Sequence, residues 1–325
     1  MACIWDFDKT LIPGYMQKPL FDAYAVDEQN FWEEVGALSN VYRQQKIAVT
    51  EDLLYLNHLL TYVKTGPFRG LNNQKLRQLG AELTFFDGLP TFFQTIKDWV
   101  EKSEHFSTHA IKLEHYIISG GLAEIIRGSK IAPHVDGIFG CEFIEEPMLP
   151  GFLHQEILPI DSTYGEISQI ARVVDNTMKT RFLFEINKGV NKHANLDVNA
   201  FMRPEDRRIP IENMIYIADG PTDVPMFSIL KGRGGKTFAV HHPDNRQEFV
   251  QNDALLESGR VDCYGPADYR PGSLTYRWLT MHVEKIAERI VRSRETLLQS
   301  RVKKPPAFDD ENSIAHLKQI DLFMA

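Results

Sequence analysis

The chain has 325 residues, of which 43% are hydrophobic, 25% charged and 11% aromatic, a composition typical of a globular protein and unlike that of a disordered or fibrous one. Its 36 Lys and Arg residues face 44 Asp and Glu residues, and the formal net charge of -8 disfavours binding to nucleic acid or to anionic lipid. The three cysteines, Cys3, Cys141 and Cys263, are too widely spaced to indicate a disulfide framework or a zinc site.

Two sequence features indicate the cellular compartment in which we expect the protein: the start of the chain and the unpaired cysteines. Residues Met1 to Trp5 lack the basic start and the apolar stretch of a signal peptide. No uninterrupted apolar segment approaches the roughly 20 residues that a membrane helix needs. Because unpaired cysteines suit a reducing compartment, we expect a cytoplasmic protein without a membrane partner.

The first predicted element is a short buried strand, Ala2 to Trp5, which would deliver Asp6 and Asp8 at its C-terminal end. From Pro13 to about Leu83 the apolar residues follow helical spacing instead. No strand-like alternation interrupts this pattern. The sequence therefore predicts a helical insertion directly after the first strand.

The main domain is expected to resume near Phe85, where Phe85 to Pro90 predicts a turn that leads into another helix. Tyr116-Ile117-Ile118 is a second buried apolar run, and it ends at Ser119-Gly120-Gly121. A predicted helix over Leu122 to Arg127 follows. A strand, a turn of small residues and a helix are typical of a parallel βαβ unit.

The second half of the chain continues this alternation. Irregular strands are predicted over Ile138 to Ile157, a helix over about Lys179 to Ile186, and strands over Met214 to Ala218 and Thr237 to Val240. Four strands separated by helices predict an α/β protein with a doubly wound parallel sheet. In such sheets ligands gather at the carboxyl ends of the strands.

The last part of the chain contains an amphipathic helix, from about Leu274 to Leu298, and then a polar tail with Pro305-Pro306. We therefore expect a catalytic core formed by residues 1–13 and 85–260, a helical insertion over residues 14–84, and a C-terminal helical extension and polar tail over residues 261–325.

Asp6-Phe7-Asp8-Lys9-Thr10 places two carboxylates on alternate residues where the first strand ends. One carboxylate can attack phosphorus, while the other gives a proton to the leaving oxygen and later takes one from water. A solvated strand end or a helix cap has the same residue types. On its own this short pattern leaves both interpretations open.

The ends of the next two strands carry complementary groups. Ser119, Gly120 and Gly121 offer a hydroxyl and unobstructed backbone N–H groups that can bind phosphate oxygens, although an ordinary turn has the same composition. Asp219 and Asp223 offer two carboxylates that can bind a divalent cation, or that simply cap a loop. With a phosphate substrate, oxygen ligands favour Mg²⁺.

Taken in order, these motifs resemble those of the haloacid dehalogenase superfamily, in particular its phosphoserine phosphatase-like members. Asp6 to Thr10 resembles motif I, and Ile117 to Gly121 resembles motif II. Ile217 to Phe227 is similar to motif IV, with Ala218 where many members have glycine. The resemblance covers the core from residue 1 to about 245, and the 14–84 insertion matches the position of a helical C1-type cap. Nothing after Val250 matches the family.

The resemblance implies a role for each of these residues. Asp6 is the nucleophile and Asp8 the general acid and base, while Thr10, Ser119, Gly120 and a motif III lysine bind the phosphate. Lys179 and Lys188 both stand near the position of that lysine. We choose Lys179 because Met178-Lys179 opens the predicted helix and is followed by Leu183 and Ile186, as in phosphoserine phosphatase-like members.

The resemblance also implies a cofactor, Mg²⁺, held by Asp6, the backbone carbonyl of Asp8, Asp219 and Asp223. Asp223 would otherwise position Lys179 or a water molecule on the metal. Tyr15, Arg43 and Arg69 are plausible substrate contacts in the cap.

The implied function is hydrolysis of a small phosphorylated metabolite through an aspartyl phosphate. Three alternatives use the same kind of site. A phosphotransferase or phosphomutase differs mainly in excluding water, and a phosphate-binding regulatory protein would not turn over at all. A halide-removing enzyme needs neither Mg²⁺ nor a proton for its leaving group, so Asp8 argues against it. The sequence indicates no particular oligomeric state.

Overall fold

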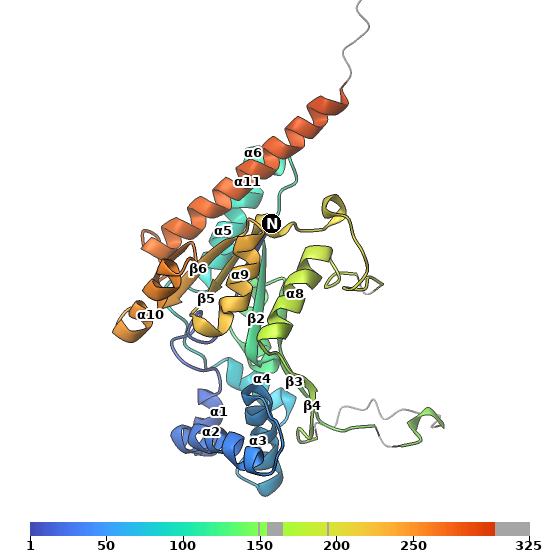
Figure 1. Cartoon of the computed structure of the whole chain (residues 1–325), viewed down its shortest axis with the longest axis vertical. Helices are drawn as coiled ribbons and strands as arrows, with labels where there is room; N and C mark the ends of the chain where they lie inside the picture. The colour runs from blue at the N-terminus through green and yellow to red at the C-terminus, as the bar shows by residue number, and fades with distance from the viewer. Residues whose placement is uncertain (149, 155–164, 194, 303–325) are drawn as a thin grey trace, which may run out of the picture.

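The computed structural model describes residues 1–148, 150–154, 165–193 and 195–302, and a seven-stranded sheet forms the centre of this part (Figure 1). The strand order is β4-β3-β2-β1-β5-β6-β7. The strands are β1 (Ala2–Trp5), β2 (Glu114–Leu122), β3 (Gly137–Ile144), β4 (Gln169–Arg172), β5 (Met214–Ala218), β6 (Lys236–His241) and β7 (Cys263–Pro266). Neighbouring strands are parallel, except that β3 and β4 are antiparallel.

The predicted fold class is confirmed: the four predicted strands are present as β1, β2, β5 and β6 in a mostly parallel α/β sheet. Their near-continuous apolar sequences suit strands that are buried on both faces.

The predicted core boundary at residue 260 needs correction, because β7 pairs with β6 and extends the sheet to Pro266. The segment Cys263-Tyr264-Gly265-Pro266 has the Gly and Pro of a turn, but proline is tolerated on an edge strand. β4 is likewise a short edge strand without a clear sequence pattern. It follows the stretch 138–157, in which β3 is the one regular strand among the described residues.

Helices cover both faces of the sheet, as a doubly wound fold requires. α8 (Asn176–Lys188) and α9 (Val224–Gly232) lie against one face, and α5 (Thr91–Lys102) and α11 (Leu274–Arg301) lie against the other. Aromatic pairs join each of these helices to a strand: Phe182 with Phe139, Phe227 with Tyr216, Phe93 with Trp5, and Trp278 with Phe238. Because successive strand side chains alternate between faces, Tyr216 and Ile217 of β5 point into opposite layers.

The predicted helical insertion appears as α1 (Lys18–Tyr24), α2 (Glu28–Gln44), α3 (Glu51–Thr65) and α4 (Asn73–Gly80). Figure 1 shows α1 to α3 gathered beyond one end of the sheet, while α11 runs past the opposite end. α4 instead packs against α7 (Ala123–Gly128) of the core, and a Cβ on Gly128 would lie only 1.6 Å from the carbonyl oxygen of Arg77. The backbones of these two helices therefore touch, which anchors the insertion to the core.

The remaining helices are α6 (Glu104–Ser107) and α10 (Arg246–Glu257). In the described part of the chain, no helix combines the length and the apolar character needed to cross a membrane. The predicted C-terminal helix is α11, whereas the predicted tail around Pro305-Pro306 lies outside the described residues.

Candidate active site

Three neighbouring strands bring the predicted motifs to one edge of the sheet. β1 lies between β2 and β5, Asp6 directly follows β1, and Asp219 directly follows β5. Ser119 lies in the last part of β2, where the pairing with β3 shifts register between Ile118 and Leu122. Asp6, Ser119 and Asp219 line one cavity of about 470 Å³, together with Asp8, Gly120 and Lys179.

Lys179 supplies a buried positive charge at this site. It stands in the first turn of α8, which begins where the Asp175 side chain accepts a hydrogen bond from the backbone N–H of Met178. Lys179 Nζ donates to Asp6 Oδ1 at 2.9 Å and to Asp223 Oδ1 at 2.7 Å. Burial lowers the pKa of Lys179, but the two carboxylates outweigh it and raise the pKa above its ordinary value.

Lys188, the other lysine considered, lies at the far end of α8. Its Nζ donates to the carbonyl oxygens of Val198 and Ala200, at 2.5 and 2.7 Å. The structure therefore brings Lys179 to the predicted nucleophile and ties Lys188 to a loop.

Asp223 is fully buried and holds Lys179 in place. Its Oδ1 also accepts a hydrogen bond from the Tyr216 hydroxyl at 2.5 Å, and its Oδ2 accepts one from the Thr222 hydroxyl at 3.3 Å. Tyr216 is absent from the sequence-based prediction. The sequence did contain a signal for it. Tyr216 has the one polar group among the side chains of the apolar run Met214 to Ala218, and a buried tyrosine hydroxyl usually has a hydrogen-bond partner.

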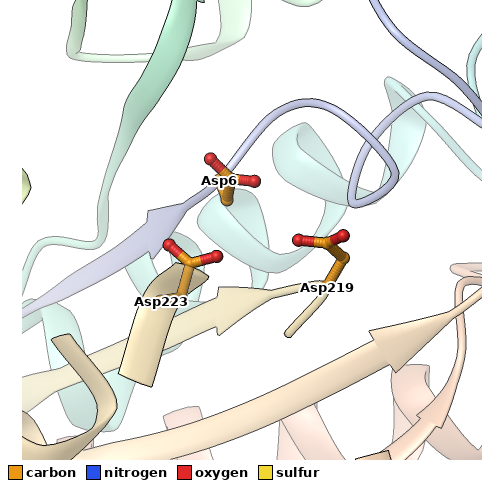
Figure 2. Close-up of side chains that lie close together, drawn as sticks. All are labelled: Asp6, Asp219 and Asp223. Carbon is orange, nitrogen blue, oxygen red and sulfur yellow. The ribbon is translucent and has the colours of Figure 1, made fainter. Parts of the chain in front are cut away.

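Asp6, Asp219 and Asp223 form an acidic cluster whose ligand oxygens lie within 4.8 Å of one another (Figure 2). Burial raises the pKa of Asp6 to about 6, although the ammonium of Lys179 opposes the shift. Burial and the charge of Asp6 raise the pKa of Asp219 well above its ordinary value. One lysine does not balance these three carboxylates, of which Asp6 and Asp223 are buried and Asp219 is half-buried, so the donor set fits a divalent cation.

Asp8 lies outside that cluster and faces the cavity from the turn after β1. Its Oδ1 accepts a hydrogen bond from the backbone N–H of Met16 at 2.9 Å, which fixes the side chain. Burial, and next the charge of Asp6, raise the pKa of Asp8 to about 8. A carboxyl group with such a pKa can hold a proton near neutral pH and give it up during a reaction.

The segment from Ser119 to Gly121, in the last part of β2, is stabilised by contacts with residues that the sequence-based prediction did not single out. Ser119 Oγ accepts from the backbone N–H of Gly121 at 3.0 Å. The Tyr55 hydroxyl, from α3, donates to the carbonyl oxygen of Gly120 at 2.7 Å. A Cβ on Gly121 would lie 2.2 Å from Met16 Cε, so a larger residue there would require the Met16 side chain to move. Contacts of this kind join segments far apart in the chain and leave no local sequence signal.

The prediction for Thr10 needs correction. Its side chain is fully buried and is not among those that line the cavity, and its carbonyl oxygen accepts a hydrogen bond from the Tyr269 hydroxyl at 2.6 Å. Thr10 has already turned away from the strand end, because the backbone N–H groups of Thr10 and Leu11 bond back to Phe7. Its place is therefore structural.

Of the three predicted cap contacts, Tyr15 lines the cavity, whereas Arg43 and Arg69 do not. The insertion contributes five further lining residues, which the sequence-based prediction missed: Gln17, Trp32, Glu51, Asp52 and Tyr55.

No family model matches the chain. An uncharacterized protein from Borreliella burgdorferi is 39% identical over 291 residues, covering 88% of this chain and 96% of that protein. Among solved structures, a HAD family hydrolase from Salmonella enterica serovar Typhi has 15% identity and a TM-score of 0.45, over 81% of this chain and 66% of the other. A phosphoserine phosphatase in its apo form has 13% identity and a TM-score of 0.45, over 81% and 92%. Likenesses at this level do not establish an activity.

Proposed function

The chain belongs to the same protein family as the Borreliella burgdorferi protein, and we propose that it is a Mg²⁺-dependent phosphomonoester hydrolase of the haloacid dehalogenase type. The observation that carries the proposal is the pair of hydrogen bonds from the buried Lys179 ammonium to Asp6 and Asp223. A cation therefore lies beside Asp6, the proposed nucleophile, at the carboxyl edge of the sheet. Small phosphorylated metabolites are the proposed substrates, because helices of the insertion contribute one wall of the cavity.

In the first half of the proposed reaction, an oxygen of Asp6 forms a bond to phosphorus while the bond from phosphorus to the alcohol oxygen breaks. The proton on Asp8 goes to that leaving oxygen. The phosphoryl oxygens are held by hydrogen bonds from Ser119 and from the backbone N–H of Gly120. The Lys179 ammonium also binds these oxygens and balances part of their negative charge.

In the second half, water attacks the aspartyl phosphate, Asp8 accepts a proton from the water, and phosphate leaves with the Asp6 carboxylate restored. Asp6, Asp219 and the carbonyl group of Asp8 would hold Mg²⁺, with Asp223 orienting Lys179. When bound, Mg²⁺ supplies the positive charge that allows a dianionic phosphate to approach these carboxylates.

Asp8→Asn is expected to slow hydrolysis more strongly as the leaving alcohol becomes less acidic. An asparagine keeps the shape of the side chain and can still accept the hydrogen bond from the backbone N–H of Met16, but its amide protons are not acidic enough to be transferred to the leaving oxygen. We expect losses in kcat/KM, which reflects only the steps up to the aspartyl phosphate, on the order of 100-fold or more with alkyl phosphates and much smaller losses with 4-nitrophenyl phosphate, whose leaving group needs no proton. Steady-state kinetics over a series of leaving groups measures this dependence, and an equal loss across the series would contradict the acid role.

The proposed function itself is tested by assaying the purified chain with Mg²⁺ against a panel of small phosphomonoesters and measuring phosphate release. Hydrolysis of at least one ester is expected. An ester that transfers its phosphate to an added alcohol without hydrolysis would favour a phosphotransferase. Phosphate binding without turnover of any ester would favour a regulatory protein.

A further inference from the structure

The wall that the insertion contributes to the cavity is acidic and aromatic. Glu51 and Asp52 occupy the first turn of α3, and the rings of Tyr15, Trp32 and Tyr55 line the same wall. Across the whole cavity, two lysines, Lys9 and Lys179, face five acidic side chains: Asp6, Glu51, Asp52, Asp219 and Asp8, which holds a proton in the proposed reaction. Such a cavity repels an anion unless positive charge enters with it.

Among the described residues, neither lysine forms an ion pair with Glu51 or Asp52. Lys179 binds Asp6 and Asp223, and Lys9 Nζ lies over the Tyr15 ring, 4.9 Å from its centroid. Within the described ranges, no lysine, arginine or histidine forms an ion pair with Glu51 or Asp52. Acidic residues are common in the first turn of a helix, where the dipole favours them. The two carboxylates here also face the cavity, so they are available to a ligand.

Gln17 supplies an independent observation at the same wall. Its side chain is 4% exposed and lines the cavity, yet its Oε1 accepts no hydrogen bond from any described residue. Leaving a buried acceptor unpaired is unfavourable, so a ligand that donates an N–H to it is favoured. The aromatic side chains suit the same ligand, because ring faces attract cations, as Lys9 shows at Tyr15.

We propose that the leaving group of the substrate carries a protonated amine, which binds to Asp52, Glu51 and Gln17, and that it carries no carboxylate. The substrate class is then the phosphate monoester of a small amino alcohol, a proposal that rests on the phosphatase function proposed above. A carboxylate on the leaving group is disfavoured, because the wall that the insertion contributes carries Glu51 and Asp52 and includes no lysine or arginine among its described lining residues.

The test compares three esters with Mg²⁺ present. They are 2-aminoethyl phosphate, 2-hydroxyethyl phosphate, whose leaving group is uncharged and which is called the neutral ester below, and O-phosphoserine, whose leaving group has both an amine and a carboxylate. The wild-type kcat/KM is expected to be highest for 2-aminoethyl phosphate, by about tenfold or more over the neutral ester. Asp52→Asn is expected to lower the ratio of these two kcat/KM values about five- to tenfold, chiefly through KM, and Glu51→Gln is expected to lower it less because Glu51 is more exposed.

The two leaving groups differ in intrinsic reactivity, but this difference is the same for every variant. It therefore cancels when the ratio of the two kcat/KM values is compared between a variant and the wild type. Glu82→Gln is the matched control, because Glu82 is an exposed acid near the end of the same insertion and does not line the cavity. It should leave the ratio unchanged. A second readout uses Asp6→Asn with Mg²⁺ in calorimetry, in which 2-aminoethyl phosphate should bind more tightly than 2-hydroxyethyl phosphate.

Two failures are distinguishable. The amine subsite is wrong, and the phosphatase function stands, if the wild-type kcat/KM for the neutral ester or for O-phosphoserine equals that for 2-aminoethyl phosphate. The same conclusion follows if Asp52→Asn leaves the ratio of kcat/KM values unchanged. If no phosphomonoester is hydrolysed at all, the phosphatase function is wrong and the substrate class fails with it.

Discussion

Asp6→Asn is expected to abolish phosphate release, lowering kcat by at least about 10⁴-fold, in the range seen when a covalent nucleophile is removed. The amide has the shape of the carboxylate but cannot form an acyl phosphate. Its oxygen can still accept the hydrogen bond from Lys179, so the fold should persist. Steady-state kinetics measures the loss, and thermal unfolding of the same preparation shows whether the protein remains folded.

The control for this substitution is Asp244→Asn, which makes the same chemical change at an exposed aspartate outside the cavity. It should keep wild-type kcat. A folded Asp6→Asn variant that turns over at a rate near the wild-type value would show that another group attacks phosphorus, and the mechanism proposed here would then be wrong.

The central strands were predictable because a strand that is buried on both faces has apolar residues at nearly every position, which gives a short apolar run in the sequence. Asp6 and Asp219 directly follow β1 and β5, and Ser119 lies in the last part of β2. Parallel strands bring their carboxyl ends to the same edge, so these three residues could be placed together in advance. β4 and β7 have only one neighbour each, and their short sequences carry no such pattern.

The parts of the site that depend on side-chain direction were less predictable. Thr10 has the expected residue type, but the backbone turn at Phe7 carries its hydroxyl away from the cavity. Tyr216 and Tyr55 act through contacts with Asp223 and Gly120, which only the packing of β5 and α3 brings within reach. Lys179 was identifiable through the helix that it opens, although the sequence alone does not show that it bonds two carboxylates.

Removal of divalent cations with a chelator is expected to abolish activity, and Mg²⁺ is expected to restore it. The carboxylate oxygens of Asp6, Asp219 and Asp223 lie within 4.8 Å of one another with one lysine among them, so without a cation they repel each other and a phosphate dianion. Ca²⁺ should inhibit, because it binds the same oxygens with looser geometry and higher coordination number. Phosphate release before and after readdition of each ion measures the effect.

Asp219→Asn separates metal binding from catalysis, because Asp219 faces the cavity and forms no ion pair within the described ranges. The substitution removes one negative charge from the cluster, so Mg²⁺ affinity measured by calorimetry without substrate should fall at least about tenfold. Asp244→Asn again serves as the control and should bind Mg²⁺ as the wild type does. Full phosphate release in thoroughly metal-free buffer would contradict the metal requirement.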